Sequence, residues 1–449
     1  MVYKYKAAAD LIKENIFSRN YKPGEKLPSI QRLSEKLNYS AETIVKAYKQ
    51  LEEQHLIYSV PKSGYYVMKN GDEIDEKERV IDMLNVYLPD KINPYKDFYH
   101  CMDKAISIYE NKLFEYSSPK GMPELINVLT KHLMNFQIFT KTENIFITNG
   151  AQQALYILGA MPFPEGRAKV LVEQPTYSVM LRILENAKTP VIGIKRTHEG
   201  VDLDELEEIF KKGDIKFFYI MPRYQNPTGF CYDNIQKKEI VKLAEKYDVY
   251  IVEDDYLADL ELDKRLDSIY TIGNKERIIY IKSFSKTLLP GLRLGMAILP
   301  KELHKKFIDF KHSIDLNTPI LTQGALEVYL KSSMYKFHIK RTKKFYKNKM
   351  ELLKNLCNKE LSDKITWYIP ETGLYAYMET KKVSSETLEK ILLNSKVLVS
   401  STRNCYIEGF RHTEGIRLCV CNASDEDIRK AVNIILRGRK RDQKKFSVD

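Results

Sequence analysis

A lysine in the second half of the chain stands among residues suited to covalent chemistry with a phosphorylated aldehyde. Lys286 follows the apolar run 277–281, with Ser283 and Ser285 just before it and Arg293 seven residues after it. An amine in this setting can form a Schiff base with an aldehyde, while the hydroxyl groups and the guanidinium hold a phosphate nearby. The pattern predicts a site for pyridoxal 5′-phosphate (PLP), with Lys286 as the catalytic residue.

A turn of small residues earlier in the chain offers a second place to bind phosphate. Gly150, Ala151 and Gln152 follow the apolar stretch 144–147 and precede an apolar helical segment. At the N-terminus of a helix, free backbone N–H groups can meet a phosphate. Many such turns only begin a helix, so this motif supports the cofactor prediction only in combination with others.

Three further segments carry side chains that could contact the cofactor ring. Tyr177 could stack on it, and the amide of Asn226, held extended by the following proline, could reach the phenolic oxygen. Asp254 ends an apolar run, where it could pair with a protonated pyridine nitrogen, and Tyr256 could donate to the ring oxygen. Singly, these residues could also be a packed aromatic, a plain turn, and a capping or metal-binding carboxylate. The lack of a histidine nearby in sequence disfavours a metal.

An arginine near the C-terminus could bind a substrate or effector. Arg417 stands just before an apolar strand, where its guanidinium could fork onto a carboxylate. A lone arginine in a strand is more often part of a surface ion pair, and the sequence alone leaves both interpretations open.

Alternating apolar runs and helical segments must position these side chains. The runs 169–172, 216–221, 249–252 and 278–281 are short and rich in Val, Ile and aromatic residues, with amphipathic segments such as 234–247 between them. This pattern is typical of an α/β fold with a buried, mostly parallel sheet. Ligands of such sheets lie beyond the carboxyl ends of the strands. The candidate residues come directly after the apolar runs, so they are expected at these ends.

The first 69 residues have a different organisation. Ala8, Leu11, Ile12 and Ile16 recur at helical spacing, and Ser29 and Ser40 can each cap a further helix. Two extended segments, at 56–60 and 65–68, then flank a turn. The order helix, helix, turn, helix, hairpin is that of a winged helix-turn-helix, whose third helix would enter the major groove of DNA. The same order also occurs in modules that bind no DNA.

Composition agrees with a multidomain protein. A chain of 449 residues is too long for one core, and its net charge of +12 favours a polyanionic partner. Residues 1–70 hold twelve basic against seven acidic side chains. The first twenty residues contain no secretory signal and the most apolar stretch, 154–163, is too short to span a bilayer, which predicts a cytoplasmic protein without a membrane partner. Six scattered cysteines, without zinc-site spacing, are expected to be reduced and buried.

These observations predict the domain boundaries. We expect a DNA-binding domain over 1–69, a polar, acidic linker over 70–79 and a cofactor domain over 80–449. Within the cofactor domain, we expect the large sheet at about 115–315, a smaller α+β subdomain at about 330–436 and a basic, solvated tail at 437–449.

Together and in this order, the motifs after Val80 resemble fold-type I PLP enzymes of the aspartate aminotransferase-like group, over roughly 80–436. The resemblance implies that Lys286 carries the cofactor as a Schiff base and that Arg417 receives an α-carboxylate. It also implies a homodimer in which a second subunit completes the site, and the stretch 116–121 resembles the family's Tyr-x-x-x-x-Gly segment. The implied cofactor-binding residues are Gly150, Ala151, Gln152, Tyr177, Asn226, Asp254, Tyr256, Ser283, Ser285, Lys286 and Arg293.

The N-terminal residues resemble the GntR family of winged-helix repressors, above all in 21–30, 33–37 and 63–65. Where that family usually has DNA-contacting arginines, this chain has Gln31 and Ala41-Glu42. Glu42 would either repel the phosphate backbone or accept a hydrogen bond from a cytosine amino group. The remaining candidates for DNA contacts are Ser29, Arg32, Ser40, Thr43, Lys46 and Lys62.

A winged helix ahead of an aminotransferase-like domain resembles the MocR subgroup of GntR regulators. The resemblance implies a transcription regulator of promoter DNA whose PLP domain senses a small amine or amino acid, or PLP itself. An active aminotransferase with a vestigial DNA module, and a PLP-binding scaffold with neither activity, are the alternatives. Val179 stands where a second arginine would bind an ω-carboxylate, which argues against γ-aminobutyrate as the effector.

Overall fold

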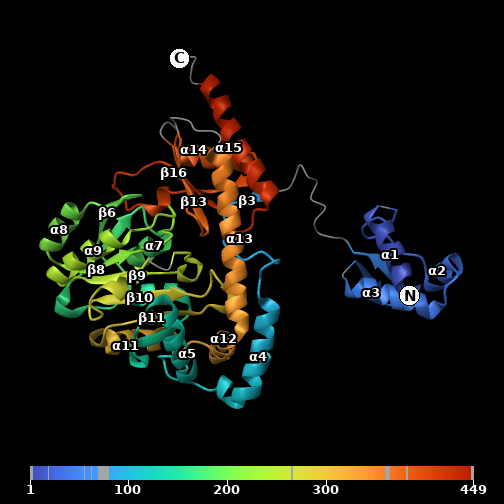
Figure 1. Cartoon of the computed structure of the whole chain (residues 1–449), viewed down its shortest axis with the longest axis horizontal. Coiled ribbons are helices and arrows are strands. Elements are labelled where there is room, and N and C mark those ends of the chain that lie inside the picture. Colours follow the sequence, from blue (N-terminus) through green and yellow to red (C-terminus); the bar gives the residue numbers. More distant parts are fainter. Residues whose placement is uncertain are drawn as a thin grey trace. The chain divides into compact units, whose positions relative to one another are not determined.

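The computed structural model describes residues 4–18, 20–54, 56–61, 63–68, 80–263, 266–358, 365–380 and 383–445. The chain divides into two compact units, residues 1–79 and 80–449 (Figure 1). The predicted linker at 70–79 lies outside the described residues, and so do the last four residues of the predicted tail.

The N-terminal unit is a three-helix bundle with a β-hairpin. Its elements are α1 (Lys4–Phe17), α2 (Ile30–Leu37), α3 (Ala41–Glu53), β1 (Ile57–Val60) and β2 (Gly64–Val67). The Oγ atoms of Ser29 and Ser40 accept the backbone N–H of Arg32 and Thr43 at 3.2 and 3.3 Å. These bonds satisfy donors that would otherwise be orphaned in the first turns of α2 and α3. The winged helix-turn-helix order predicted from the sequence is confirmed.

The buried face of α1 differs from the predicted one. Ala8, Ala9 and Ile12 are buried, whereas Leu11 is 42 % exposed. Two adjacent alanines let α1 approach α3 closely, and this contact rotates Leu11 away from the core. Periodicity alone predicted that Leu11 is buried, because the method considers the hydrophobicity of each residue. It does not consider the space available between two closely packed helices.

A mostly parallel sheet forms the centre of the second unit. Within the described residues, its strands follow the order β4 (Ile145–Thr148), β11 (Gly295–Ile298), β10 (Ile278–Ser283), β9 (Tyr250–Asp254), β8 (Ile215–Ile220), β5 (Lys169–Gln174), β6 (Val191–Thr197) and β7 (Gly200–Val201). Only β11 and β7 run antiparallel to their neighbours. The prediction of a mostly parallel sheet is confirmed, while β11 was not anticipated because it lies directly after the lysine motif and resembles a continuation of it.

Helices cover the large sheet on both faces. Those of the unit are α4 (Tyr95–Tyr109), α5 (Pro123–Leu133), α6 (Gly150–Ala160), α7 (Ser178–Asn186), α8 (Leu203–Lys211), α9 (Asn234–Lys246), α10 (Ile269–Ile272), α11 (His304–Asp315), α12 (Ile320–Lys331), α13 (Ser333–Asn358), α14 (Ser385–Asn394) and α15 (Asp425–Lys445). Residues of β8 alternate between two cores: Phe217 and Tyr219 pack with α6 and α7, and Phe218 and Ile220 pack with α5 and α9. Burial on both faces explains why the strands are nearly continuous apolar runs.

A smaller antiparallel sheet completes the unit. Its strands are β12 (Ile365–Tyr368), β13 (Tyr375–Thr380), β16 (Gly415–Cys419) and β15 (Ser400–Ser401), in that order. The long helix α13 runs from α12 to this sheet (Figure 1). Beside it, β3 (Ile81–Asp82) pairs with β14 (Val397–Leu398), so the segment after residue 80 joins the C-terminal part of the chain.

The remaining sequence predictions concern membranes and thiols. Among the described residues, no helix is long and apolar enough to cross a membrane. All six cysteines are free, and all but the partly exposed Cys231 are buried, as predicted.

Candidate cofactor site and DNA-binding surface

A cavity of about 480 Å³ lies at the carboxyl ends of the parallel strands. Segments that lie far apart in the sequence meet around it. The predicted site residues on its wall are Ala151, Gln152, Tyr177, Asn226, Asp254, Tyr256, Ser283, Ser285, Lys286, Arg293 and Arg417. Gly150 stands directly behind Arg293, since a Cβ atom on it would lie 3.0 Å from Arg293 Nη2.

The turn at the start of α6 is held in a form that suits phosphate. Gly150 has a φ of +72°, a conformation that other residues adopt only under strain. Arg293 Nη2 donates to Gln152 Oε1 at 3.2 Å, and Gln152 Nε2 donates to the Tyr177 hydroxyl at 3.0 Å. Ser285 Oγ is buried and has no partner in the described part of the chain. A hydroxyl left unpaired in this position fits a phosphate oxygen.

Asp254 ends β9, lines the cavity and is 4 % exposed. Tyr219 on β8 donates to its Oδ2 at 2.8 Å, while its Oδ1 is buried and meets no partner among the described residues. Burial raises the pKa of Asp254 to about 7 although the Tyr219 bond lowers it. A carboxylate with a free buried oxygen fits the cationic N–H of a protonated pyridine ring, which would stabilise its ionised form.

Lys286 follows β10 and is partly buried at the wall of the cavity. Burial lowers the pKa of its amine, and the positive charges of Arg417 and Arg293 act in the same direction. A lysine with a depressed pKa has a larger neutral fraction, and the neutral amine is the form that attacks a carbonyl.

Arg417 lies on β16, opposite Tyr377 of β13. Its Nη1 donates to Asn226 Oδ1 at 3.2 Å and its Nη2 donates to the Leu84 carbonyl at 3.3 Å, while its guanidinium carbon lies 4.6 Å above the ring of Tyr375. Arg417 forms no ion pair with any described residue, so the interpretation as a surface ion pair does not apply. An oriented, uncompensated guanidinium in a cavity is suited to a ligand carboxylate.

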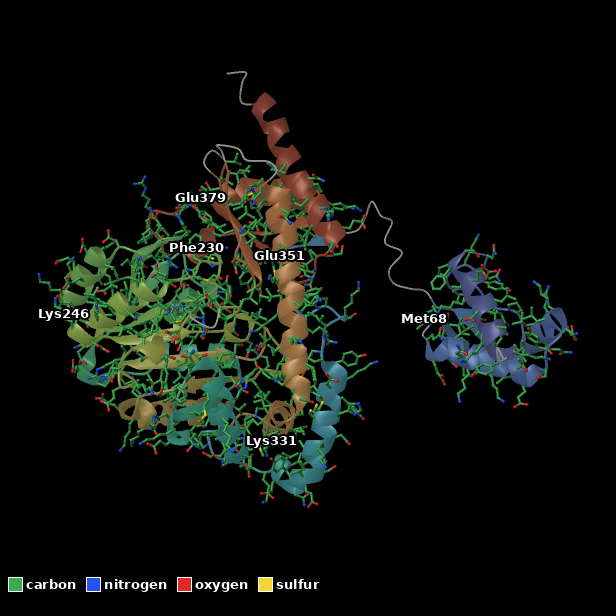
Figure 2. All side chains as sticks on the ribbon, viewed as in Figure 1. Met68, Phe230, Lys246, Lys331, Glu351 and Glu379 are labelled. Carbon is green, nitrogen blue, oxygen red and sulfur yellow. The ribbon has the colours of Figure 1, made fainter. Side chains whose placement is uncertain are left out.

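The loop that carries Asn226 is fastened to the small sheet. A Cβ atom on Gly229 would lie 2.8 Å from the Tyr375 carbonyl, which shows how closely the loop approaches β13. Phe230, labelled in Figure 2, packs against the rings of Tyr368 and Tyr377 at 5.0 and 6.0 Å. The loop thereby couples the positions of Asn226 and Arg417 across two sheets.

One predicted contact is engaged elsewhere. Tyr256 lines the cavity, but its hydroxyl donates to the Tyr224 carbonyl at 2.6 Å. A bond from Tyr256 to the ring oxygen of a cofactor therefore requires this hydrogen bond to be exchanged.

Several residues of the cavity wall escaped sequence reasoning. They are Leu84, Asn85, Val86, Leu155, Ser178, Met221 and Tyr375. The first three arrive through the pairing of two-residue strands β3 and β14, which leave no periodic signal. Tyr219, which donates to Asp254, escaped as well, because strand alternation places it on the same buried face as Phe217 and gives no sign of this contact.

The predicted DNA contacts that the structure describes lie on α2 and α3 or cap the N-termini of these helices. Ser40 Oγ also contacts Thr43 Oγ1 at 2.8 Å, and Lys46 Nζ donates to Glu42 Oε1 at 2.8 Å. Ser29 is the α2 cap and Arg32 is exposed in the first turn of that helix. Lys62 lies outside the described residues. Apart from Arg32, each described candidate already has an intramolecular partner.

Comparisons with known proteins cover both units. Residues 4–67 match the family described as bacterial regulatory proteins, gntR family, and residues 85–435 match aminotransferase class I and II. The chain is 40 % identical over 439 residues to YcxD of Bacillus subtilis, an uncharacterized HTH-type transcriptional regulator, covering 96 % of this chain and 99 % of that protein. This chain belongs to the MocR subgroup of GntR-family transcription regulators.

Other relatives agree with the MocR assignment. The HTH-type transcriptional regulator NorG of Staphylococcus aureus is 26 % identical over 437 residues, which cover 91 % of this chain and 98 % of NorG. The kynurenine aminotransferase of Pyrococcus horikoshii superposes with a TM-score of 0.75 at 25 % identity, over 81 % of this chain and 91 % of that one. Thermus thermophilus LysN, an α-aminoadipate aminotransferase solved with N-(5′-phosphopyridoxyl)-L-leucine, shares the fold with a TM-score of 0.73 at 24 % identity, over 80 % of this chain and 92 % of that one. The cofactor of this MocR regulator is PLP.

Proposed function

We propose that this MocR regulator senses a small amine or amino acid through Lys286 and converts its binding into a change in affinity for promoter DNA. The observation that carries the proposal is the meeting of Lys286, Asp254 and Arg417 in one cavity. Bound PLP supplies an aldehyde that forms a reversible Schiff base with an amine.

Each side chain has a proposed role. Asp254 would pair with the ring nitrogen, Asn226 and Tyr256 would contact the ring oxygen, and Tyr177 would stack on the ring. The turn of α6, Ser283, Ser285 and Arg293 would hold the phosphate. Arg417 would bind the effector's carboxylate, and an effector amine that competes for the same carbon would release the Lys286 side chain. The effector can shift DNA affinity only if it binds one arrangement of the protein better than another.

The cavity wall supports an effector with an uncharged side chain. In the described residues, the charged groups on the wall are Asp254, Lys286, Arg293 and Arg417, and each of them is assigned to the cofactor or to the effector's α-carboxylate. The other lining residues, Val86 and Val179 among them, are uncharged. Among the described residues that one subunit contributes to the wall, a second carboxylate would therefore find no cationic partner.

A homodimer is part of the proposal. Tyr95, Tyr99 and Ile106 form a stripe on α4 and are 55, 67 and 43 % exposed, and Tyr116 is 88 % exposed. An exposed apolar stripe of this kind is typical of a subunit interface. We expect Tyr99→Asp to shift the full-length protein from dimer to monomer in light scattering, whereas Tyr156→Asp, a change at an exposed tyrosine of α6, leaves a dimer. A dimeric Tyr99→Asp protein would place the interface elsewhere.

The proposal is tested on the purified full-length protein. Borohydride reduction followed by peptide mapping should find a pyridoxyl group on Lys286, and Lys286→Ala should abolish it. Among amino acids offered to the PLP-bound protein, those with an uncharged side chain should change both its absorbance and its band shift with the DNA upstream of its own gene. An adduct on another lysine, or DNA binding that ignores every amino acid, would contradict the proposal.

The same preparation distinguishes an aminotransferase. Lys286, Asp254, Asn226 and Arg417 are also the residues that transamination would use, so sustained conversion of an amino acid and a keto acid is a possible outcome of that chemistry. Repeated turnover without specific DNA binding would favour the enzyme. A single half-reaction coupled to altered DNA binding would favour the sensor.

A further inference from the structure

The last residue of α11 is hydrogen-bonded to the residues that flank the turn at the start of α6. Asp315 Oδ2 accepts hydrogen bonds from Asn149 Nδ2 at 2.5 Å and from Gln153 Nε2 at 2.7 Å. Gln153 Oε1 in turn accepts the backbone N–H of Asn149 at 2.8 Å. One carboxylate thus fixes the two side chains that flank Gly150, Ala151 and Gln152.

With Asn149 bound to Asp315, α6 has no side-chain cap at its N-terminus. Asn149 is the N-cap residue of α6, and asparagine is among the preferred N-caps because its oxygen accepts an N–H of the first turn. In this turn the side chain of Asn149 makes no such bond. Its amide is directed to Asp315 instead, so the N–H groups at the start of α6 stay available for an anion.

The position of Asp315 destabilises its own helix, α11. A carboxylate at the C-terminal end of a helix meets the negative end of the helix dipole. Lys311, one turn earlier and with a fully buried side chain, compensates it at 2.9 Å. Lys311 also donates to Thr318 Oγ1 at 3.1 Å, which fixes the segment after α11. The buried Lys311 thus compensates the charge of Asp315. The other partners of Asp315 are Asn149 and Gln153, on either side of the α6 turn.

We propose that Asp315 is a positioning residue for the phosphate of PLP: it binds the side chains of Asn149 and Gln153, on either side of the turn, and so fixes the turn in the form that receives the phosphate. The inference rests on the proposed role of the α6 turn as the phosphate site. Asp315 does not line the cavity, so it would act on the phosphate through the turn.

The test compares two ligands that differ only in the phosphate. Absorbance titrations of the full-length protein with PLP and with pyridoxal give the ratio of the dissociation constant of pyridoxal to that of PLP. We expect Asp315→Asn to lower this ratio about tenfold, through weaker binding of PLP alone, since loss of a charge-assisted bond costs on the order of 1.5 kcal/mol or more. Asp309→Asn is the matched control: it lies on the same helix, faces an exposed lysine at 3.3 Å and should leave the ratio unchanged.

A second variant covers a failure of Asp315→Asn to fold. Asn149→Ala keeps the Lys311–Asp315 ion pair but removes one of the two amides that bind Asp315. Because the turn is then fixed on one side only, this variant should also lower the ratio. Equal weakening of PLP and pyridoxal, or an unchanged ratio in Asn149→Ala, would overturn the inference. A wild-type protein that binds PLP no better than pyridoxal would instead refute the α6 turn as the phosphate site, which separates the two failures.

Discussion

At the scale of single residues, the carboxyl of Asp254 is the group whose ionisation the fold opposes most clearly within the cavity. Burial raises its pKa from 3.8 to about 7 in the absence of a cationic partner. Well below pH 3.8 the carboxyl is protonated in both the folded and the unfolded chain. As the pH rises toward 7, the unfolded chain releases this proton first, so the folded state loses stability relative to it.

A substitution at this position should remove that loss. We expect Asp254→Asn, in the PLP-free protein, to gain free energy of unfolding relative to wild type as the pH rises from 4 to 7, by at most about 1.4 kcal/mol per pH unit. Urea denaturation at several pH values measures the difference. Above pH 7 the difference should level off. Parallel curves for the two proteins would show that burial does not raise the pKa of this carboxyl.

At the scale of elements, the contact between β11 and α6 sets the position of the phosphate turn. A Cβ atom on Gly295 would lie 2.7 Å from both the Ala151 nitrogen and the Gly150 carbonyl carbon, and these backbone atoms cannot rotate away. Gly295→Ala must therefore displace the turn. We expect its affinity for PLP to fall at least about tenfold in absorbance titrations, because phosphate recognition depends on ångström-scale placement.

A nearby glycine supplies the control for this prediction. A Cβ atom on Gly291 would have nothing within 4 Å, so Gly291→Ala should bind PLP as the wild type does. Similar losses in both variants would mean that the lysine loop as a whole tolerates no substitution, and that the β11–α6 contact is not the cause.

Helix α3, which is predicted to enter the major groove, carries an ion pair where a DNA contact was predicted. Lys46 and Glu42 are one turn apart, with side chains 60 and 78 % exposed. Glu42→Gln should free Lys46 for a backbone phosphate, which raises DNA affinity and steepens the dependence of log K on log salt by about one unit. Band shifts at a series of salt concentrations measure both. Glu53→Gln, at the far end of the same helix, should change the slope little; weaker binding by Glu42→Gln would indicate that Glu42 contacts a base.

The sequence revealed the elements that keep a simple period and missed those fixed by distant contacts. The parallel strands were visible because both of their faces are buried, and Ser29 and Ser40 because a cap is a local pattern. The exposure of Leu11, the insertion of β11 and the arrival of Leu84 at Arg417 depend on partners tens or hundreds of residues away. Residue spacing also could not show that the Tyr256 hydroxyl is bonded to Tyr224.

At the scale of the whole molecule, the proposed function requires a coupling free energy between two binding sites in separate compact units. If an effector changes the affinity for DNA by some factor, DNA must change the affinity for that effector by the same factor. This reciprocity holds for any route of communication between the units. It makes the coupling measurable at the cofactor, where absorbance reports effector binding directly.

We therefore expect an amino acid that alters the band shift to titrate the PLP absorbance at a different midpoint when the protein is saturated with its DNA. The ratio of the two midpoints should equal the ratio of DNA dissociation constants with and without that amino acid. Lys286→Ala should bring both ratios to one, since no lysine is left for the effector amine to displace. A wild-type protein in which the effector changes absorbance with the same midpoint in the presence and absence of DNA has two independent sites, and its aminotransferase-like unit is then not a sensor of that effector.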